Sequence, residues 1–166
     1  MIAMNFDYRA ELLDSQDNLI TVKTSSSYLW PGEKRFLIES AVVAPNLKTV
    51  QSRVIKTDWK KISTSLARPT FPMDIELMGP PHPSRMGFYE VDATLNNENL
   101  RDYQFIDVNV LLADQLGNVI AANKTRLSGV KSLEKRLFEI IWFSPFKGTP
   151  AKVDFQTSVD PKQLGL

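Results

Sequence analysis

An alternation with a period of two recurs in the segment Tyr103–Phe143. Every second residue from Ile106 to Leu112 is aliphatic, whereas Asp107 and Asn109 stand between them. A period of two places alternate side chains on one face of a half-buried β-strand. Turn-forming residues interrupt the alternation at short intervals, a spacing typical of small antiparallel sandwiches. The segment therefore predicts antiparallel β-structure.

A second copy of this pattern lies in the first half of the chain. Asp14, Asn18 and Ile20 recur as the same residue types one hundred positions later. The tripeptide Glu33–Arg35 recurs as Glu134–Arg136, with one extra residue in the preceding loop. Alternation and Asp/Asn turns are common to all sandwiches, but a shared Glu-Lys-Arg at matching distance favours an internal duplication.

Alternation predicts strands along the whole chain, separated by Asp, Asn, Gly and Pro turns. The predicted strands are Asn5–Leu13, Leu19–Thr24, Glu33–Val43, Thr49–Trp59, Phe71–Leu77, Met86–Leu95, Tyr103–Ala113, Val119–Asn123, Glu134–Trp142 and Lys152–Val159. Predicted loops include Ser25–Gly32, Gly79–Pro83 and Leu127–Leu133. Gly79–Pro83 is predicted as a loop because its three prolines cannot donate to a sheet ladder. At most one short helical turn is expected, near Lys60–Leu66.

A polar stretch that ends in Pro69 divides the two copies and reads as a linker. We expect a first domain over residues 1–60, a linker over 61–70 and a second domain over 71–166. Six strands are predicted in the second domain, enough to close a sandwich, and four in the first.

The first domain is predicted to be incomplete. Its pattern begins with the counterpart of Tyr103–Ala113, and nothing in it corresponds to Phe71–Leu77 or Met86–Leu95. Such a sheet exposes backbone donors and acceptors along an edge. We expect that edge to be covered by a strand from a second molecule, by the second domain, or by a segment upstream of Met1.

Charge balance and the lack of cysteine exclude several classes of function. The chain has 20 Lys and Arg against 19 Asp and Glu, so it offers no field for nucleic acid or an anionic membrane surface. Without cysteine there is no disulfide, thiolate metal site or cysteine nucleophile. The 7 glycines form no phosphate-binding loop or dinucleotide fingerprint. Neither a signal peptide nor a membrane span of roughly 18 apolar residues is present.

The few candidate catalytic or metal-binding residues favour ordinary structural roles. His82, the one histidine, lies in Pro80–Pro83, where the geometry of a catalytic triad or a zinc site is not expected. Asp14 and Asp114 are predicted to cap turns, because the spacing of a calcium-binding EF-hand is absent. We therefore predict no catalytic, cofactor-binding or metal site, and no enzyme.

Aromatic residues provide the one candidate binding surface. Tyr28, Trp30 and Trp59 are the candidates for stacking against a ligand such as a sugar. Trp30 lies in a predicted loop and is the best candidate for exposure. Trp59 ends a predicted strand and Trp142 lies within one, and both positions favour packing in a core or at a domain junction.

Framework turns and strands carry a family resemblance. The stretches in the second half are Glu90–Asn96, Asp107–Asp114, Gly117–Ala121 and Glu134–Trp142. They resemble the FxLYD immunoglobulin-like domains of bacterial envelope proteins. Nearly the whole chain also looks like two-domain proteins of small-genome uncultured bacteria, in which a membrane helix precedes two such domains. The stretches that carry this second resemblance are Pro31–Glu39, Thr57–Trp59 and Trp142–Phe146.

The resemblance implies two tandem immunoglobulin-like antiparallel β-sandwich domains and no catalytic or binding residues. It implies a non-enzymatic extracytoplasmic envelope protein, acting as a structural spacer or a protein-interaction module. The full-length protein would be membrane-anchored, by a helix that this chain lacks. A carbohydrate-binding module on a β-sandwich is the alternative. The expected partner is a protein or a second copy joined through the open sheet edge. Nucleic acid is not expected, and membrane contact is expected only through the anchor.

Overall fold

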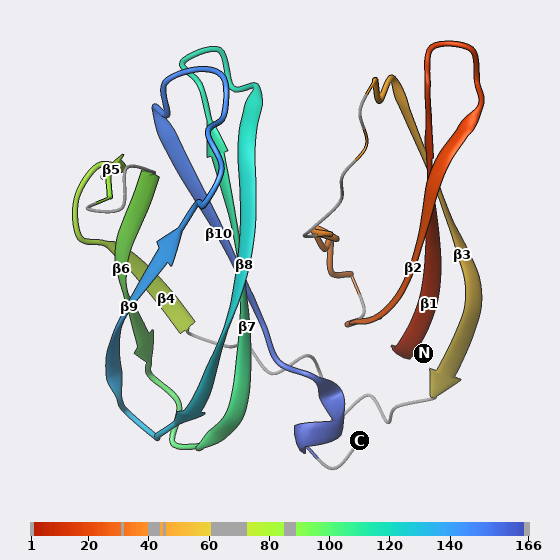
Figure 1. The fold of residues 1–166 in the computed structure, drawn as a ribbon. Helices are drawn as coiled ribbons and strands as arrows, with labels where there is room; N and C mark the ends of the chain where they lie inside the picture. The colour runs from red at the N-terminus through yellow and green to blue at the C-terminus, as the bar shows by residue number, and fades with distance from the viewer. Residues whose placement is uncertain are drawn as a thin grey trace. The chain divides into compact units, whose positions relative to one another are not determined.

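The computed structural model of the protein describes residues 2–30, 32–39, 44, 46–60, 73–84 and 89–164. The chain divides into two compact units, Met1–Pro69 with Leu164–Leu166, and Thr70–Gln163. The described residues form three antiparallel sheets, none of which closes into a barrel (Figure 1). The prediction of an all-β chain is thus confirmed. No helix in this part of the chain is long and apolar enough to cross a membrane.

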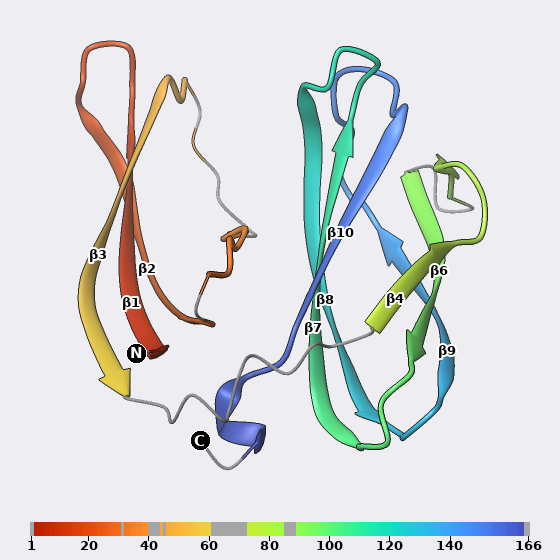
Figure 2. The same cartoon turned by 180° about the vertical axis from the view of Figure 1, so that it is seen from behind.

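In the first unit, β1 is the middle strand of a three-stranded sheet. The strands are β1 (Ile2–Leu13), β2 (Leu19–Leu29) and β3 (Thr49–Lys60). Both β2 and β3 run antiparallel to β1, in the order β2-β1-β3. β2 and β3 are therefore the two edges of this sheet, and Figure 2 shows β1 between them from behind.

One face of this sheet, which we call the inner face, carries the buried side chains of Tyr8 and Leu12. Segment 33–39 lies against this face, because the Tyr8 hydroxyl donates a hydrogen bond to the Glu39 carboxylate. Burial, assisted by this contact, raises the pKa of Tyr8 above its ordinary value. The inner face is therefore covered over the central strand.

Two predicted loops are wrong where they begin, because the strands before them are longer. β2 continues through Ser25–Leu29, and its three serines pair with residues Phe6–Tyr8 of β1. β8 (Val119–Val130) similarly continues beyond the predicted loop start at Leu127. Strand preference depends on cross-strand context, so continuous pairing along the ladder outweighs the weak preference of serine.

The predicted strand Glu33–Val43 is wrong over residues 33–39, which are assigned to no strand, and residues 40–43 lie outside the described part. Its counterpart in the second unit is β9 (Lys135–Ile141), which pairs with β6 (Tyr89–Asn97). The described residues of the first unit contain no counterpart of β6. An alternating pattern becomes a strand only where a neighbouring strand accepts its backbone hydrogen bonds.

The second unit has two sheets. β6 is the centre of one sheet. β4 pairs with its residues Ala93–Asn97, β5 with Tyr89 and Glu90, and β9 with Glu90–Asn96. β7 is the centre of the other, in the order β10-β7-β8. The remaining bounds are β4 (Met73–Leu77), β5 (His82–Pro83), β7 (Tyr103–Ala113), β8 (Val119–Val130), β10 (Lys152–Ser158) and a 3-10 turn, η1 (Pro161–Leu164).

The two sheets of the second unit share one core. β6 buries every second residue from Val91 to Asn97, and β7 does the same from Ile106 to Leu112. Phe138 of β9 meets the ring of Phe155 on β10 edge to face, with 6.4 Å between centroids. Burying each large aliphatic side chain of this kind contributes about 1.5–3 kcal/mol. The second unit therefore covers its own apolar faces.

The proline-rich segment before β6 departs from its predicted loop. His82 and Pro83 pair with Glu90 and Tyr89 of β6 as the two-residue strand β5. Pro83 is compatible with this position because β5 is short and lies at an edge, where a missing N–H leaves no interior ladder bond broken. Residues 61–66, 71–72 and 85–88, on which other parts of the predictions fall, lie outside the described part.

The turns after β1 and β7 have the same geometry. Oδ1 of Asp14 accepts hydrogen bonds from the backbone N–H groups of Gln16 and Asn18, at 2.8 and 2.9 Å. Oδ1 of Asp114 accepts them from Leu116 and Asn118, both at 2.9 Å. The Asn side chain of each turn also donates to its Asp, and this bond is the main cause that lowers the pKa of both carboxyl groups.

The turn before β9 also has its equivalent in the first unit. The backbone N–H of Trp30 donates to Oε2 of Glu33 at 2.8 Å, and the N–H of Lys131 donates to Oε2 of Glu134 at 2.5 Å. The glutamate of each repeated tripeptide thus fastens its own turn. The hydrogen bond that this glutamate accepts is therefore duplicated, as well as its place in the sequence.

Gln163 completes the edge of the ladder where the chain leaves β10. Its Oε1 accepts a hydrogen bond from the backbone N–H of Phe105 at 2.8 Å, and its Nε2 donates to the Phe105 carbonyl at 2.9 Å. A single amide side chain therefore satisfies both backbone groups of a β7 residue, as a paired strand residue would.

We predict that Gln163→Ala lowers the free energy of unfolding by about 1–2 kcal/mol, because it removes both bonds to Phe105. Urea denaturation of the full chain measures this, with Lys162→Ala on the same turn as the matched control. Gln163→Glu keeps the acceptor but loses the donor and should fall between wild type and Gln163→Ala. Equal stability of the two alanine variants would contradict the role of the amide.

We predict that Asp114→Asn weakens the pH dependence of stability below pH 4. The folded pKa of Asp114 is depressed, so its contribution is present above the unfolded pKa of about 3.9 and is lost as pH falls through the folded value. Thermal melts across acidic pH should therefore show a shallower decline for the variant, with Asp74→Asn as the control. A decline as steep as that of wild type would show that protonation of Asp114 is not coupled to unfolding.

Candidate functional site

The three candidate aromatic residues do not form one exposed surface. Trp30 is 2% exposed and Tyr28 is 6% exposed, whereas Trp59 is 58% exposed. The expectation that Trp30 is exposed is therefore wrong, because β2 continues to its neighbour and Glu33 closes the turn around it. The guanidinium of Arg35 lies 3.9 Å from the centroid of the Tyr28 ring, a cation–π arrangement.

The predictions for the two other tryptophans, Trp142 and Trp59, had different outcomes. Trp142 is buried, and its indole N–H donates to the carbonyl of Ala122 at 3.3 Å, so the prediction of core packing is confirmed. For Trp59, packing in a core is wrong, because Trp59 lies on the edge strand β3 and is 58% exposed, and packing at a domain junction stays a prediction. The structure thus leaves one exposed tryptophan among the predicted binding aromatics.

A histidine and two carboxylates gather on the outer side of the β6 sheet. His82 of β5 lies opposite Glu90 of β6, and Asp92 follows Glu90 on the same face. Nε2 of His82 lies 3.2 Å from Oδ2 of Asp92, and Nδ1 lies 3.3 Å from the carbonyl oxygen of Pro83. Donor atoms of the three residues all lie within 4.8 Å of one another.

Both ring nitrogens of His82 face oxygen acceptors, so the doubly protonated imidazolium fits the site best. The hydrogen bond with Asp92 is the main cause that raises the pKa of His82, followed by the bond with the Pro83 carbonyl. One imidazole and two carboxylates are also ligands that Zn²⁺ accepts, but they are three donors where a structural zinc site uses four.

Sequence reasoning missed this cluster, although part of its signal is present. Glu90 and Asp92 alternate in a predicted strand, which places them on one face. The pairing of His82 with this strand depends on the path of a proline-rich segment, which periodicity does not show. The predicted exposed loop histidine is therefore a partly exposed strand residue with an acidic partner.

β3 carries an exposed apolar stripe on the inner face of the first sheet. Val50 pairs with Leu12 and Val54 pairs with Tyr8, so both valines share the face of these buried residues. After a register shift at Ile55, Trp59 returns to the same face. We call Val50, Val54 and Trp59 the β3 stripe. They are 56%, 57% and 58% exposed.

The matching positions in the second unit are covered. Val153 of β10 pairs with Leu112, and Thr157 pairs with Val108, as the two valines of the β3 stripe pair in the first unit. Val153 and Thr157 are only partly exposed, since β9 packs over β10. At this edge the second unit therefore has a second layer, which the described residues of the first unit do not form.

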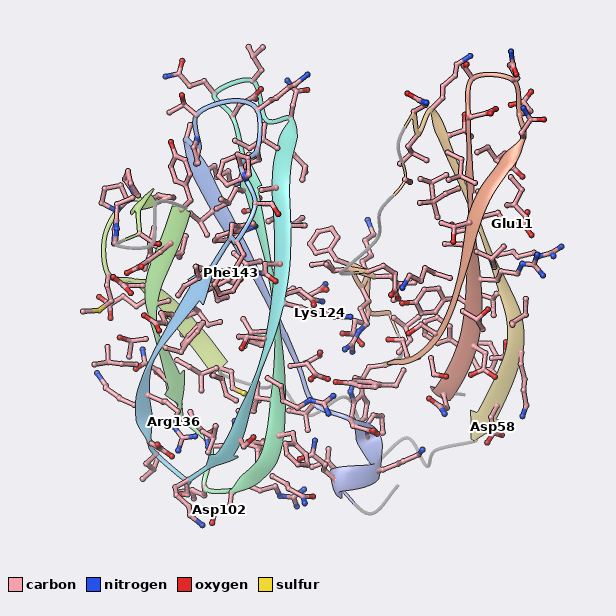
Figure 3. All side chains as sticks on the ribbon, viewed as in Figure 1. Glu11, Asp58, Asp102, Lys124, Arg136 and Phe143 are labelled. Atoms are coloured by element: carbon pink, nitrogen blue, oxygen red, sulfur yellow. The ribbon has the colours of Figure 1, made fainter. Side chains whose placement is uncertain are left out.

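The outer face of β3 is charged. Arg53, Lys56 and Asp58 are all exposed along it. Nη2 of Arg53 lies 3.5 Å from Oε1 of Glu11 on β1, and Figure 3 labels Glu11 and Asp58 on their strands. Charges on an edge strand discourage unspecific pairing with other chains. β3 is thus an edge with one apolar face and one charged face.

A depression of about 320 Å³ in the second unit is lined in part by Asp107, Arg126 and Gln163. The carboxylate of Asp107 accepts a 2.6 Å bond from Nε of Arg126, and the Gln163 amide is bonded to Phe105. Asp107, Arg126 and Gln163 are therefore already engaged in hydrogen bonds within the unit.

We predict that the His82 imidazole titrates above its ordinary pKa of about 6.5 and that Asp92→Asn lowers this pKa. The cluster then stabilises the fold below the unfolded pKa of histidine and loses this effect as pH rises through the folded value. Proton NMR reads the value directly, because His82 is the one histidine. Glu98→Gln is the matched control, and a pKa unaffected by Asp92→Asn would refute the pairing.

These surfaces offer different chemistry. The His82 cluster holds a proton between oxygen acceptors, the depression is internally paired, and the β3 stripe exposes apolar area beside a free sheet edge. Of the three, the β3 stripe is the one that combines exposed apolar side chains with the backbone of an edge strand. The sequence matches no protein-family model, no curated protein and no solved structure.

Proposed function

We propose that this protein is a non-enzymatic, extracytoplasmic protein-interaction module made of two immunoglobulin-like units. In the second unit the chain changes sheet between β6 and β7, between β8 and β9, and between β9 and β10. Crossovers of this kind between two antiparallel sheets are characteristic of immunoglobulin-like sandwiches. The extracytoplasmic location and a membrane anchor in the full-length protein rest on the resemblance to FxLYD-type envelope domains.

The first unit supports the same proposal as a partial copy. β1, β2 and β3 occupy the places of β7, β8 and β10, with the same central strand and the same turn after it. The described residues of this unit supply no second sheet. Its inner face is therefore open at β3, which is where a partner reaches both apolar side chains and backbone groups.

Exposure of the β3 stripe is the observation that carries the proposal. Three large apolar side chains on one face of an edge strand are each more than half exposed. A strand of another protein that adds to this edge gains main-chain hydrogen bonds and buries the stripe in one step. Fold similarity alone would not identify a function, since sandwiches serve many unrelated ones.

Burial of the aromatics disfavours the carbohydrate-binding alternative. Sugar recognition on a sandwich needs exposed aromatic faces, and Tyr28 and Trp30 are enclosed. Of the three candidate aromatics only Trp59 is accessible, and it belongs to the β3 stripe. A protein partner uses all of this surface, whereas a sugar would use one ring.

We predict that a photo-crosslinker at Val54 of the full chain captures a discrete protein adduct in the cells that naturally produce it. The same group at Leu116, an exposed turn residue of the second unit, is the matched control. The expected result is an adduct of defined mass at Val54 and none at Leu116. Equal labelling at both positions, or none at either, would overturn the proposal.

A second measurement separates the two candidate functions. Tryptophan fluorescence of the full chain, with Trp59→Phe as its reference, reports any sugar that stacks on the exposed ring. No change is expected across a panel of cell-wall sugars. A saturable change that Trp59→Phe abolishes would replace the protein-interaction proposal with carbohydrate binding.

A further inference from the structure

We infer that β3 binds the β3 strand of a second copy of this chain, with Arg53 of each copy opposite Asp58 of the other. The inference rests on the proposed function, because it names the occupant of the same edge. Two three-stranded sheets would then form one continuous antiparallel sheet with the order β2-β1-β3-β3-β1-β2.

Symmetry keeps the two faces of β3 in place. An antiparallel pair of identical strands has a two-fold axis perpendicular to the sheet, so the inner face of one copy continues as the inner face of the other. Pairing Arg53 with Asp58 also places Val54 opposite Thr57, and Ser52 opposite Trp59. All four of these residues belong to the inner face. The β3 stripes of the two copies therefore lie on the same face of the joined sheet, with Val54 and Trp59 of one copy opposite Thr57 and Ser52 of the other.

Charge complementarity selects this register. Arg53 and Asp58 both lie on the outer face and are exposed, and the exposed Arg53, now 3.5 Å from Glu11 of its own chain, would also reach Asp58 of the other copy across the new ladder. The symmetry makes the attraction occur twice, once at each end of the paired segment. A register displaced by two residues would instead place Arg53 opposite Lys56, a like-charged pair that destabilises a strand pairing.

The register shift at Ile55 restricts the other possibilities. Before the shift the even-numbered residues of β3 lie on the inner face, and after it the odd-numbered residues do. A residue before the shift therefore shares its face with a residue of opposite parity after it. Arg53 with Asp58 joins a residue before the shift to one after it, so inner-face residues lie opposite inner-face residues on both sides of the two-fold axis, and Ile55 and Lys56 lie at the axis itself. A second copy of the chain can thus pair with the backbone groups of this edge strand, and no other protein is required.

Sedimentation equilibrium of the full chain over a wide concentration range tests the inference. Wild type is expected to dimerise reversibly, and more weakly at high salt because the pairs are exposed. Arg53→Asp and Asp58→Arg should each weaken the dimer by on the order of tenfold, since each replaces attraction by repulsion at both ends. The double variant R53D/D58R restores opposite charges and should recover the wild-type affinity.

Arg101→Asp and Glu98→Arg, exposed positions of the second unit, make the same changes in net charge and should leave the dimer intact. Circular dichroism melts establish that each variant is folded, and Val54→Lys provides a second break in the interface without altering the charge pair. A wild type that stays monomeric, or single variants that the double variant does not rescue, would overturn the inference. In either case the Val54 crosslink to a different protein still decides the proposed function separately.

Discussion

A β-sheet has to cover one face with a second layer, and the position of β6 decides where this protein does so. β6 supplies the centre of the second sheet in the second unit, and β9 becomes a strand by pairing with it. With that layer present, the inner residues of β7 from Ile106 to Leu112 are completely buried. The described residues of the first unit have the equivalent of β7 but not of β6, and its counterpart of β9 is not a strand. The lack of this layer among the described residues accounts for both the irregular segment 33–39 and the exposed edge at β3.

Much of the fold follows from local pattern. Alternation correctly identified the central strands β1 and β7, and the repeated Asp and Asn residues correctly predicted their capped turns. The errors share one physical cause, which is that a strand needs a partner that periodicity does not reveal. β2 is longer than predicted because Ser25–Leu29 pairs with β1, whereas residues 33–39 have the pattern of a strand but form none.

The candidate sites were harder to predict than the strands, for the same reason. Trp30 stood in a predicted loop and proved to be buried, and Trp59 stood in a strand and proved to be exposed. Exposure depends on which layer covers a face, and that is a property of the whole unit. His82 was missed because its acidic neighbours come from a strand that begins beyond the prolines. The sequence pattern predicted on which face of a strand each side chain lies, but it did not predict which faces pack against one another.

The amide of Gln163 has a mechanical consequence. β10 is held to β7 by a ladder that ends with Ser158 opposite Asp107, and a pull on the chain beyond η1 would open such a ladder from that end, one bond at a time. Such a pull reaches the two hydrogen bonds between Gln163 and Phe105 before it reaches this ladder. Tension must break both together before β10 can peel away. A load arriving from that side is thus delivered to the central strand of the unit, its most deeply packed element, instead of to its edge.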